Sequence, residues 1–172
     1  MNKYLIDTNI FIESAYRFYA FDICPGFWDF LDKCSQLDSI KSINKVYDEI
    51  TSDNTNLQDF KEKLKNRGFF LPIGSITPSS YTKISQTLQT MQYTQQAVTD
   101  FSSGADYFLV ALAYQESYTI VTHEAKSSNN AKNTIKIPNV CERLEINCID
   151  IAEFLRREQA RFILEHTTQQ KS

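Results

Sequence analysis

Four acidic residues in this sequence lie where strands and helices are expected to begin or end. They are Asp7, Glu49, Asp106 and Glu124. Asp7 directly follows the apolar run at residues 4–6, and Glu124 lies two residues past the β-branched run at residues 119–122. Open parallel sheets place their functional groups beyond the carboxyl ends of the strands, so Asp7 and Glu124 are candidates for one site. Each of them is also suited to capping a helix, which is a purely structural role.

The other two acids are placed by helical patterns. Asp106 begins an almost wholly apolar segment at residues 105–114, where an acid stabilises the helix dipole. An apolar helix of this kind is expected to be buried, which brings Asp106 toward the edge of the sheet near Asp7. Glu49 lies near the end of a helix that bears Val46 and Ile50, against the dipole preference. A structural role is therefore less natural for Glu49, although an exposed Glu in a last turn remains an alternative.

Clustered carboxylates favour one kind of chemistry. Carboxylates that converge in one cleft repel one another and raise each other's pKa unless a cation neutralises them. An all-oxygen set of ligands suits Mg²⁺ or Mn²⁺, which can orient an attacking water and stabilise the charge that develops on phosphoryl oxygens. The four acids therefore predict a divalent-metal site for phosphodiester chemistry.

The elements that must position these acids alternate along the chain. Strands are expected at residues 3–7, 39–42, 69–73, 119–122, 135–140 and 148–150. Helices are expected from residue 25, after a cap at Ser42 or Asn44, at 56–67, within 79–101, at 105–114, as a turn at 141–144, and from 151 to about 164. This alternation predicts an α/β fold with a short, mainly parallel sheet and helices on both faces.

Length and composition favour one globular domain. The 172 residues are enough to bury a core without disulfides or structural metals. Residues 1–165 are predicted to form a single domain, and residues 166–172 a polar tail that frays because it has no apolar residue to dock it. A hydrophobic share of 42% and a charged share of 23% exclude the disordered and fibrous classes.

Further classes are excluded by what the sequence lacks. No apolar run approaches the roughly 20 residues needed to cross a bilayer, and no signal-like segment opens the chain, so a cytoplasmic protein without membrane contact is expected. The cysteines show no zinc-site spacing and are expected to be free thiols: Cys24, Cys34, Cys141 and Cys148. The net charge of −3 does not suggest a nucleic-acid binder, but a carboxylate centre that recruits cations must itself be acidic.

Two segments resemble the motifs of PIN-domain ribonucleases. The string from Tyr4 to Ile12 resembles their opening motif, and Ala105-Asp106 with the following apolar helix and the string from Ile120 to Glu124 resembles their closing motif. The order and spacing of the four acids match as well. Residues 21–28 resemble a bacterial branch catalogued only as a domain of unknown function, related to toxin ribonucleases. The resemblance covers residues 3 to about 155 and implies a PIN-like three-layer α/β/α sandwich.

The resemblance also implies roles for single residues. Asp7, Glu49 and Asp106 would be the principal metal ligands, and Asn9 or Thr8 would support Asp7 by hydrogen bonding. Glu124 departs from the pattern, because the family more often has Asp there, and its longer side chain would hold the metal through water or not at all. Thr122 would orient water or phosphate at the tip of its strand. All four acids are therefore predicted to be catalytic and metal-binding.

The function implied by this resemblance is a Mg²⁺- or Mn²⁺-dependent endoribonuclease that cuts single-stranded RNA. By the same resemblance it would be the toxin of a toxin–antitoxin pair, blocked by an antitoxin, and would form a homodimer. Candidate phosphate contacts are Arg17, Lys45, Lys126, Lys132 and Lys136. His123 is left outside the catalytic set, because a lone His in a loop is more often simply solvated.

Two other functions are compatible with the sequence. A non-catalytic PIN-like module that binds RNA or a protein is favoured by Glu124 and by the acidic overall charge. A phosphatase of the haloacid-dehalogenase kind also begins with an Asp at a strand end, but it requires a second Asp two residues later. This chain has Asn9 at that position, so the phosphatase ranks last.

Overall fold

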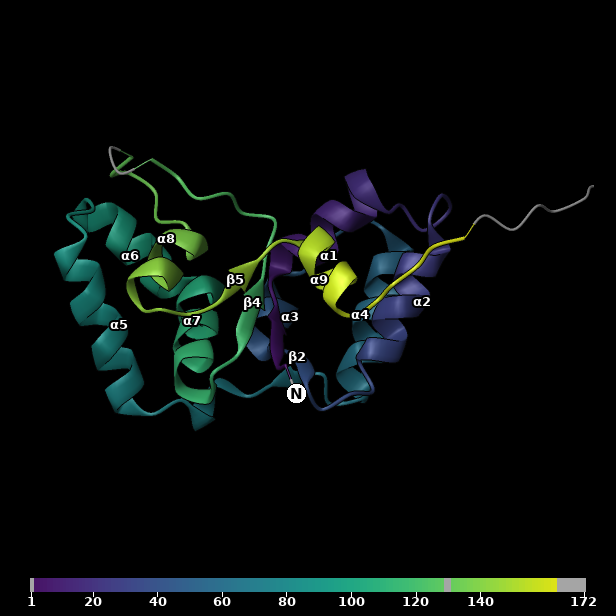
Figure 1. The fold of residues 1–172 in the computed structure, drawn as a ribbon, viewed down its shortest axis with the longest axis horizontal. Coiled ribbons are helices and arrows are strands. Elements are labelled where there is room, and N and C mark those ends of the chain that lie inside the picture. Colours follow the sequence, from purple (N-terminus) through teal and green to yellow (C-terminus); the bar gives the residue numbers. More distant parts are fainter. Residues whose placement is uncertain (1, 129–130, 164–172) are drawn as a thin grey trace, which may run out of the picture.

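The computed structural model describes residues 2–128 and 131–163. These residues form a five-stranded sheet in the order β3-β2-β1-β4-β5, and every strand pair in it is parallel. The strands are β1 (Tyr4–Ile6), β2 (Ile40–Ile43), β3 (Phe70–Leu71), β4 (Thr119–Val121) and β5 (Cys148–Ile149). Helices lie on both sides of the sheet (Figure 1), so the predicted three-layer α/β/α fold is confirmed.

Helices make up most of the rest of the described chain. They are α1 (Thr8–Glu13), α2 (Pro25–Cys34), α3 (Asn44–Glu49), α4 (Thr55–Asn66), α5 (Pro78–Thr90), α6 (Gln95–Ser103), α7 (Ala105–Glu116), α8 (Ile137–Arg143) and α9 (Ile151–Arg157). A π-helical turn, Ser14–Phe18, extends α1, and a 3₁₀ turn, Ile73–Ser75, follows β3. In Figure 1, α5, α6, α7 and α8 gather on one side of the sheet and α2, α4 and α9 on the other.

The central strand β1 determines which residues meet at the edge of the sheet. Tyr4, Leu5 and Ile6 are fully buried, as expected for a strand that is covered on both faces. Ile6 is in register with Val121 of β4. The residues that follow them, Asp7 and Thr122, therefore lie side by side at the carboxyl ends of the two strands.

Helix α7 is the core helix of the molecule. Leu109, Val110 and Ala111 are fully buried, and the helix packs on α5, α6 and α8 as well as on the sheet. A helix that is apolar on all sides must be surrounded by protein. The expectation that the helix carrying Asp106 is buried is confirmed.

Two expected elements differ in the structure. The strand predicted at residues 135–140 is wrong, because Ile137–Arg143 is helix α8. Pro138 suits the first turn of a helix, and the β-branched residues that suggested a strand are buried on the helix instead. The last helix ends at Arg157 rather than near residue 164, because Gln159 adopts a positive φ of 55° that ends the helical path. The tail predicted to fray lies outside the described residues.

The expected helix caps are also corrected. Ser42 lies inside β2, where its hydroxyl donates to the carbonyl of Ile6 at 2.6 Å, and Asn44 is the first residue of α3. Neither side chain caps that helix. Asp7 precedes α1 but its carboxylate makes no capping hydrogen bond, so the purely structural alternative for Asp7 loses its support.

No helix in the described part of the chain is long and apolar enough to cross a membrane. All four cysteines are free thiols, as the sequence predicted.

The burial of α7 predicts the effect of a truncation. Leu109→Ala removes a fully buried side chain and leaves a cavity beneath the helix that carries Asp106. We expect it to lower the free energy of unfolding by about 3 kcal/mol, measured by urea denaturation. Tyr114→Ala, at a position 39% exposed on the same helix, should cost less than about 1 kcal/mol. Equal losses for the two variants would contradict this assignment of the core.

Candidate active site

A cavity of about 360 Å³ lies beside the residues that follow β1 and β4. All four predicted acids line it: Asp7, Glu49, Asp106 and Glu124. Thr8 and Asn9, predicted to support Asp7, line it as well. The structure therefore brings together residues that are spread over more than a hundred positions of the sequence.

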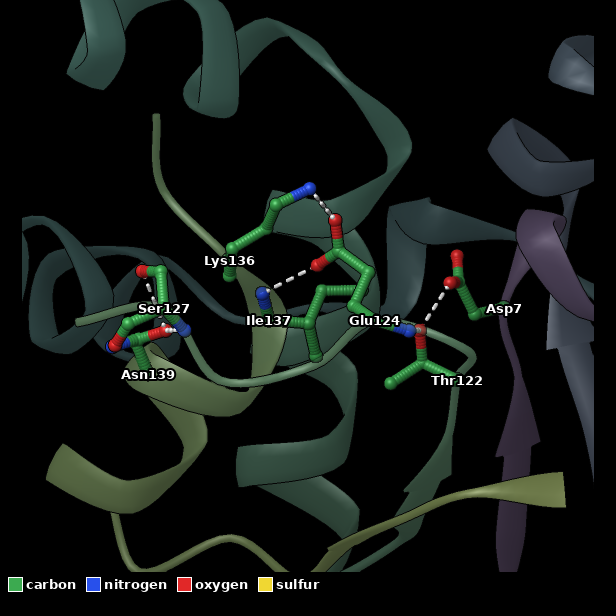
Figure 2. Close-up of polar contacts among 7 residues, drawn as sticks. All are labelled: Asp7, Thr122, Glu124, Ser127, Lys136, Ile137 and Asn139. Atoms are coloured by element: carbon green, nitrogen blue, oxygen red, sulfur yellow. Dashed lines mark hydrogen bonds and ion pairs between the residues drawn. The ribbon is translucent and has the colours of Figure 1, made fainter. Parts of the chain in front are cut away.

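Asp7 is the most deeply buried acid of the cavity, with 1% of its surface exposed. Its Oδ2 accepts a hydrogen bond of 2.7 Å from the hydroxyl of Thr122 (Figure 2). Its Oδ1 is buried and has no hydrogen-bond partner among the described residues. Burial raises the pKa of Asp7 to about 6, and the Thr122 hydroxyl opposes that rise. One oxygen of this carboxylate is thus left for a ligand that the protein itself does not provide.

Thr122 orients Asp7. Its hydroxyl donates to Asp7 and accepts a 3.0 Å hydrogen bond from the backbone N–H of Glu124. The side chain is 1% exposed and is not part of the cavity lining. This hydroxyl is therefore placed behind Asp7, and the predicted contact of Thr122 with water or phosphate has no support in this arrangement.

Asp106 is the second residue of α7 and is partly buried at the cavity. No hydrogen bond to its carboxylate is formed within residues 2–128 and 131–163. Burial raises the pKa of Asp106 to about 8, and the charge of Asp7 contributes more to this rise than that of any other neighbouring acid. Asp7 and Asp106 are therefore a pair of carboxylates that destabilise each other's charged form.

Glu49 is held by the ends of two helices. Its Oε2 accepts from the hydroxyl of Thr8 at 3.0 Å, and its Oε1 accepts from the backbone N–H of Ala105 at 2.8 Å. Ala105 is the first residue of α7, whose N–H groups lack partners within the helix. The carboxylate therefore stabilises the start of α7, which explains an acid at the unfavourable end of α3.

Glu124 is held even more completely. Its Oε1 accepts from the ammonium of Lys136 at 2.6 Å, and its Oε2 accepts from the backbone N–H of Ile137 at 2.8 Å (Figure 2). Its side chain is only 10% exposed. Both oxygens of Glu124 are thus engaged by the start of α8.

The cavity fits a divalent cation held by two acids better than by four. Among the described residues, no three His, Cys, Asp or Glu side chains are grouped closely enough to hold one ion together. Within the described residues, Oδ1 of Asp7 and the carboxylate of Asp106 accept no hydrogen bond, whereas Glu49 and Glu124 have protein donors on both oxygens. Mg²⁺ is usually held by one or two carboxylates, with water in its other positions. The donor chemistry of Asp7 and Asp106 therefore suits Mg²⁺ or Mn²⁺.

Several residues of the cavity were not among the predicted ones. Asp100 of α6 and the segment Asn133, Thr134 and Ile135 also line it. Residues 79–101 are rich in Gln and Thr and suggested only peripheral helices, so Asp100 was not predicted as a site residue. Its position six residues before Asp106, separated by the break at Gly104 between α6 and α7, is the feature that relates the two acids in the sequence.

The predicted phosphate contacts are widely separated. Lys136 lines the cavity. Lys126 forms an ion pair with Glu142, Lys132 donates to the carbonyl of Met91, and Lys45 lies 5.5 Å from the ring centre of Phe108. Arg17 belongs to the π-helical turn that follows α1. The structure therefore favours Lys136 within this set.

His123 is not a simply solvated loop residue, so that part of the sequence interpretation is wrong. Its ring stacks on Phe18 with 4.9 Å between the ring centres, and its Nε2 is buried without a hydrogen-bond partner in the described chain. Burial lowers the pKa of His123, which favours the neutral imidazole at neutral pH. His123 does not line the cavity and stays outside the candidate catalytic set.

Comparison with known families gives a match to the family model described as "Domain of unknown function (DUF4411)", over residues 4–162. The match includes all four predicted acids. No curated protein and no solved structure matches the chain. Nothing in these findings links the chain to PIN-domain ribonucleases, so that resemblance stays a prediction.

The raised pKa values of Asp7 and Asp106 predict the pH dependence of the metal-free protein. A buried acid with a raised pKa binds its proton more tightly in the folded state than in the unfolded state. The free energy of unfolding should therefore fall as the pH rises from about 4, the unfolded pKa, to about 8, the folded pKa of Asp106. Asp106→Asn removes this charge, so its melting temperature at pH 8 with EDTA should exceed that of the wild type by about 3 °C or more.

Circular dichroism melts at several pH values measure this difference. Asp59→Asn on α4 is the matched control, because Asp59 is exposed and should leave the pH dependence unchanged. A melting temperature that falls equally with pH in the wild type and in Asp106→Asn would show that the Asp106 charge is not the destabilising group.

Proposed function

The chain belongs to the DUF4411 family of unknown function, and we propose that it is a metal-dependent endoribonuclease that hydrolyses RNA phosphodiesters. The observation that carries this proposal is the buried Oδ1 of Asp7, which has no hydrogen-bond partner among the described residues. Asp7 lines the same cavity as Asp106. Two neighbouring carboxylates that are withdrawn from water and have few hydrogen-bond donors are costly to charge unless a cation neutralises them. A divalent cation at this pair is the simplest explanation for keeping both acids.

The reaction class follows from the donor set, and the substrate from the resemblance. Oxygen ligands that bind Mg²⁺ or Mn²⁺ are suited to transfer of phosphoryl groups to water. The resemblance of Asp7, Glu49 and Asp106 to the acids of PIN-domain ribonucleases supports RNA as the substrate. Unpaired RNA is favoured, because its backbone can be brought past an edge of the sheet without a duplex in the way.

Each residue of the cavity has a distinct part in this proposal. Asp7 and Asp106 would hold the ion directly, and Thr122 keeps the Asp7 carboxylate in one orientation. Glu49 fixes the first residue of α7 against α1 and so sets where Asp106 lies. A bound Mg²⁺ or Mn²⁺ supplies a Lewis acid and lowers the pKa of water. The toxin role, an antitoxin partner and a homodimer stay predictions from the resemblance.

A cleavage assay tests the proposal. The purified protein should cut a 5′-labelled single-stranded RNA in the presence of Mn²⁺ or Mg²⁺ and not in EDTA. Asp7→Asn and Asp106→Asn should each lower the rate by more than about 100-fold, because each removes a charged oxygen from the ion. Asp59→Asn, an exposed acid on α4, is the matched control and should cut like the wild type. Cleavage at the wild-type rate by both Asp7→Asn and Asp106→Asn would contradict the proposed mechanism.

Metal binding distinguishes the enzyme from a non-catalytic module that binds RNA or protein. A ligand that binds only the folded state stabilises it by about 2.7 kcal/mol at 100 times its Kd. Mn²⁺ should therefore raise the melting temperature of the wild type and of Asp59→Asn, and have little effect on Asp106→Asn. A wild-type melting temperature that does not respond to Mn²⁺ would favour the non-catalytic module.

A further inference from the structure

Glu124 and Lys136 form an ion pair at the cavity that Asp7 and Asp106 also line. The Lys136 ammonium lies 2.6 Å from Glu124 Oε1, and the exposed fractions of the two side chains are 37% for Lys136 and 10% for Glu124. The N–H of Ile137 holds the other oxygen of Glu124. Figure 2 shows both contacts converging on the Glu124 carboxylate from the start of α8. The carboxylate is therefore held in one place by two donors.

A chain of hydrogen bonds connects this ion pair to Asp7. The backbone N–H of Glu124 donates to the hydroxyl of Thr122, and that hydroxyl donates to Asp7 Oδ2 (Figure 2). Asp7, Thr122, Glu124 and Lys136 are thus fixed relative to one another. The position of the Lys136 ammonium therefore depends on the carboxyl end of β4, which also positions Asp7 through Thr122.

A second contact holds the start of α8 against the segment that follows β4. The N–H and the hydroxyl of Ser127 both donate to Asn139 Oδ1, at 2.9 and 3.1 Å, and Asn139 Nδ2 donates to the carbonyl of Ser127 at 3.0 Å. Figure 2 places this pair on the far side of Ile137 from Asp7. The start of α8 therefore has its own attachment, and the Glu124–Lys136 pair is not needed alone to hold it.

Lys136 is a cation in an otherwise acidic cavity. Of the described Lys and Arg side chains, Lys136 alone lines it, beside Asp7, Glu49, Asp100, Asp106 and Glu124. The hydrogen bond with Glu124 raises the pKa of Lys136, so the ammonium stays charged at neutral pH. An ammonium has three N–H donors, and Glu124 takes one of them. Two donors remain available on a side chain that is still partly exposed.

A phosphodiester that enters this cavity carries a negative charge toward several carboxylates. A cation held by Asp7 and Asp106 would offset part of that repulsion, and a second positive group at the same cavity would reduce it further. We propose that Lys136 binds a phosphate group of the RNA substrate and that Glu124 is the residue that positions Lys136, rather than a ligand of the metal. This inference rests on the proposed function, since it assigns the substrate contact of the same cavity.

RNA binding to a protein that cannot cut tests the role of Lys136. In the Asp7→Asn background, fluorescence anisotropy with a labelled oligouridine RNA and Mn²⁺ should give a measurable Kd. Adding Lys136→Met should raise that Kd about 10-fold and lower the salt dependence by about 0.7 in log–log slope, the value for one phosphate contact on a single strand. Lys136→Arg should stay within about threefold, because the charge is kept.

Lys63→Met is the matched control. Lys63 of α4 also forms an ion pair, with Asp32 at 2.8 Å, but it is not part of the cavity lining. Adding Lys63→Met to Asp7→Asn should leave the Kd for RNA within about twofold of that of Asp7→Asn alone. If RNA binds and Lys136→Met has no more effect than Lys63→Met, the inference is wrong while the proposed function stands. If no variant binds RNA and the wild type does not cut it, both fail.

Two measurements test the role of Glu124. In calorimetric titration, the Kd of Glu124→Gln for Mn²⁺ should lie within about threefold of the wild-type Kd. The Kd of Asp106→Asn should be about 10-fold higher or more. In a double-mutant cycle, Lys136→Met should weaken RNA binding less in the Glu124→Gln background than in the wild type. The reason is that Lys136 is no longer held in position once Glu124 is replaced. Loss of Mn²⁺ binding in Glu124→Gln, or additive effects of the two changes on RNA binding, would overturn this role.

Discussion

Buried negative charge is the constraint on which the carboxyl edge of this sheet depends. Asp7 follows a strand that is covered on both faces, so folding buries its carboxylate away from water. The apolar helix α7 then brings Asp106 to the same cavity, and each acid raises the cost of charging the other. The molecule folds with this unfavourable pair in place, which is the pattern expected when local stability is given up for the binding of a ligand.

The four acids differ in how the protein treats their charge. Glu49 and Glu124 are satisfied by backbone N–H groups at the starts of α7 and α8, together with Thr8 and Lys136. Among the described residues, no donor reaches Oδ1 of Asp7, and the Asp106 carboxylate accepts no hydrogen bond. The two Glu residues therefore build the frame of the cavity, and under the proposed function the two Asp residues would hold the metal ion. A side chain one methylene longer is what allows each Glu to reach across to another element.

Local sequence was sufficient to predict some of these features and not others. The position of Asp7 follows from a short apolar run, and that of Asp106 from an apolar helix, because both depend on residues next to them. The contact between Glu49 and Ala105 joins residues 56 positions apart, and no local pattern reveals it. The helical state of residues 137–143 was also missed, because buried β-branched residues occur in both kinds of element.

The pairing of β1 with β4 has a consequence for the order of events during synthesis. The hydrogen bond between Asp7 and Thr122 joins residues 115 positions apart, and Asp106 precedes the second of them by only a short segment. Contacts at such separations form late, since a long loop must close before they stabilise anything. A growing chain has Asp7 from the outset but no neighbouring strand to bury it. The cavity is therefore completed only after most of the polypeptide has left the ribosome, and a nuclease of the kind proposed above would stay inactive beside the ribosome until then.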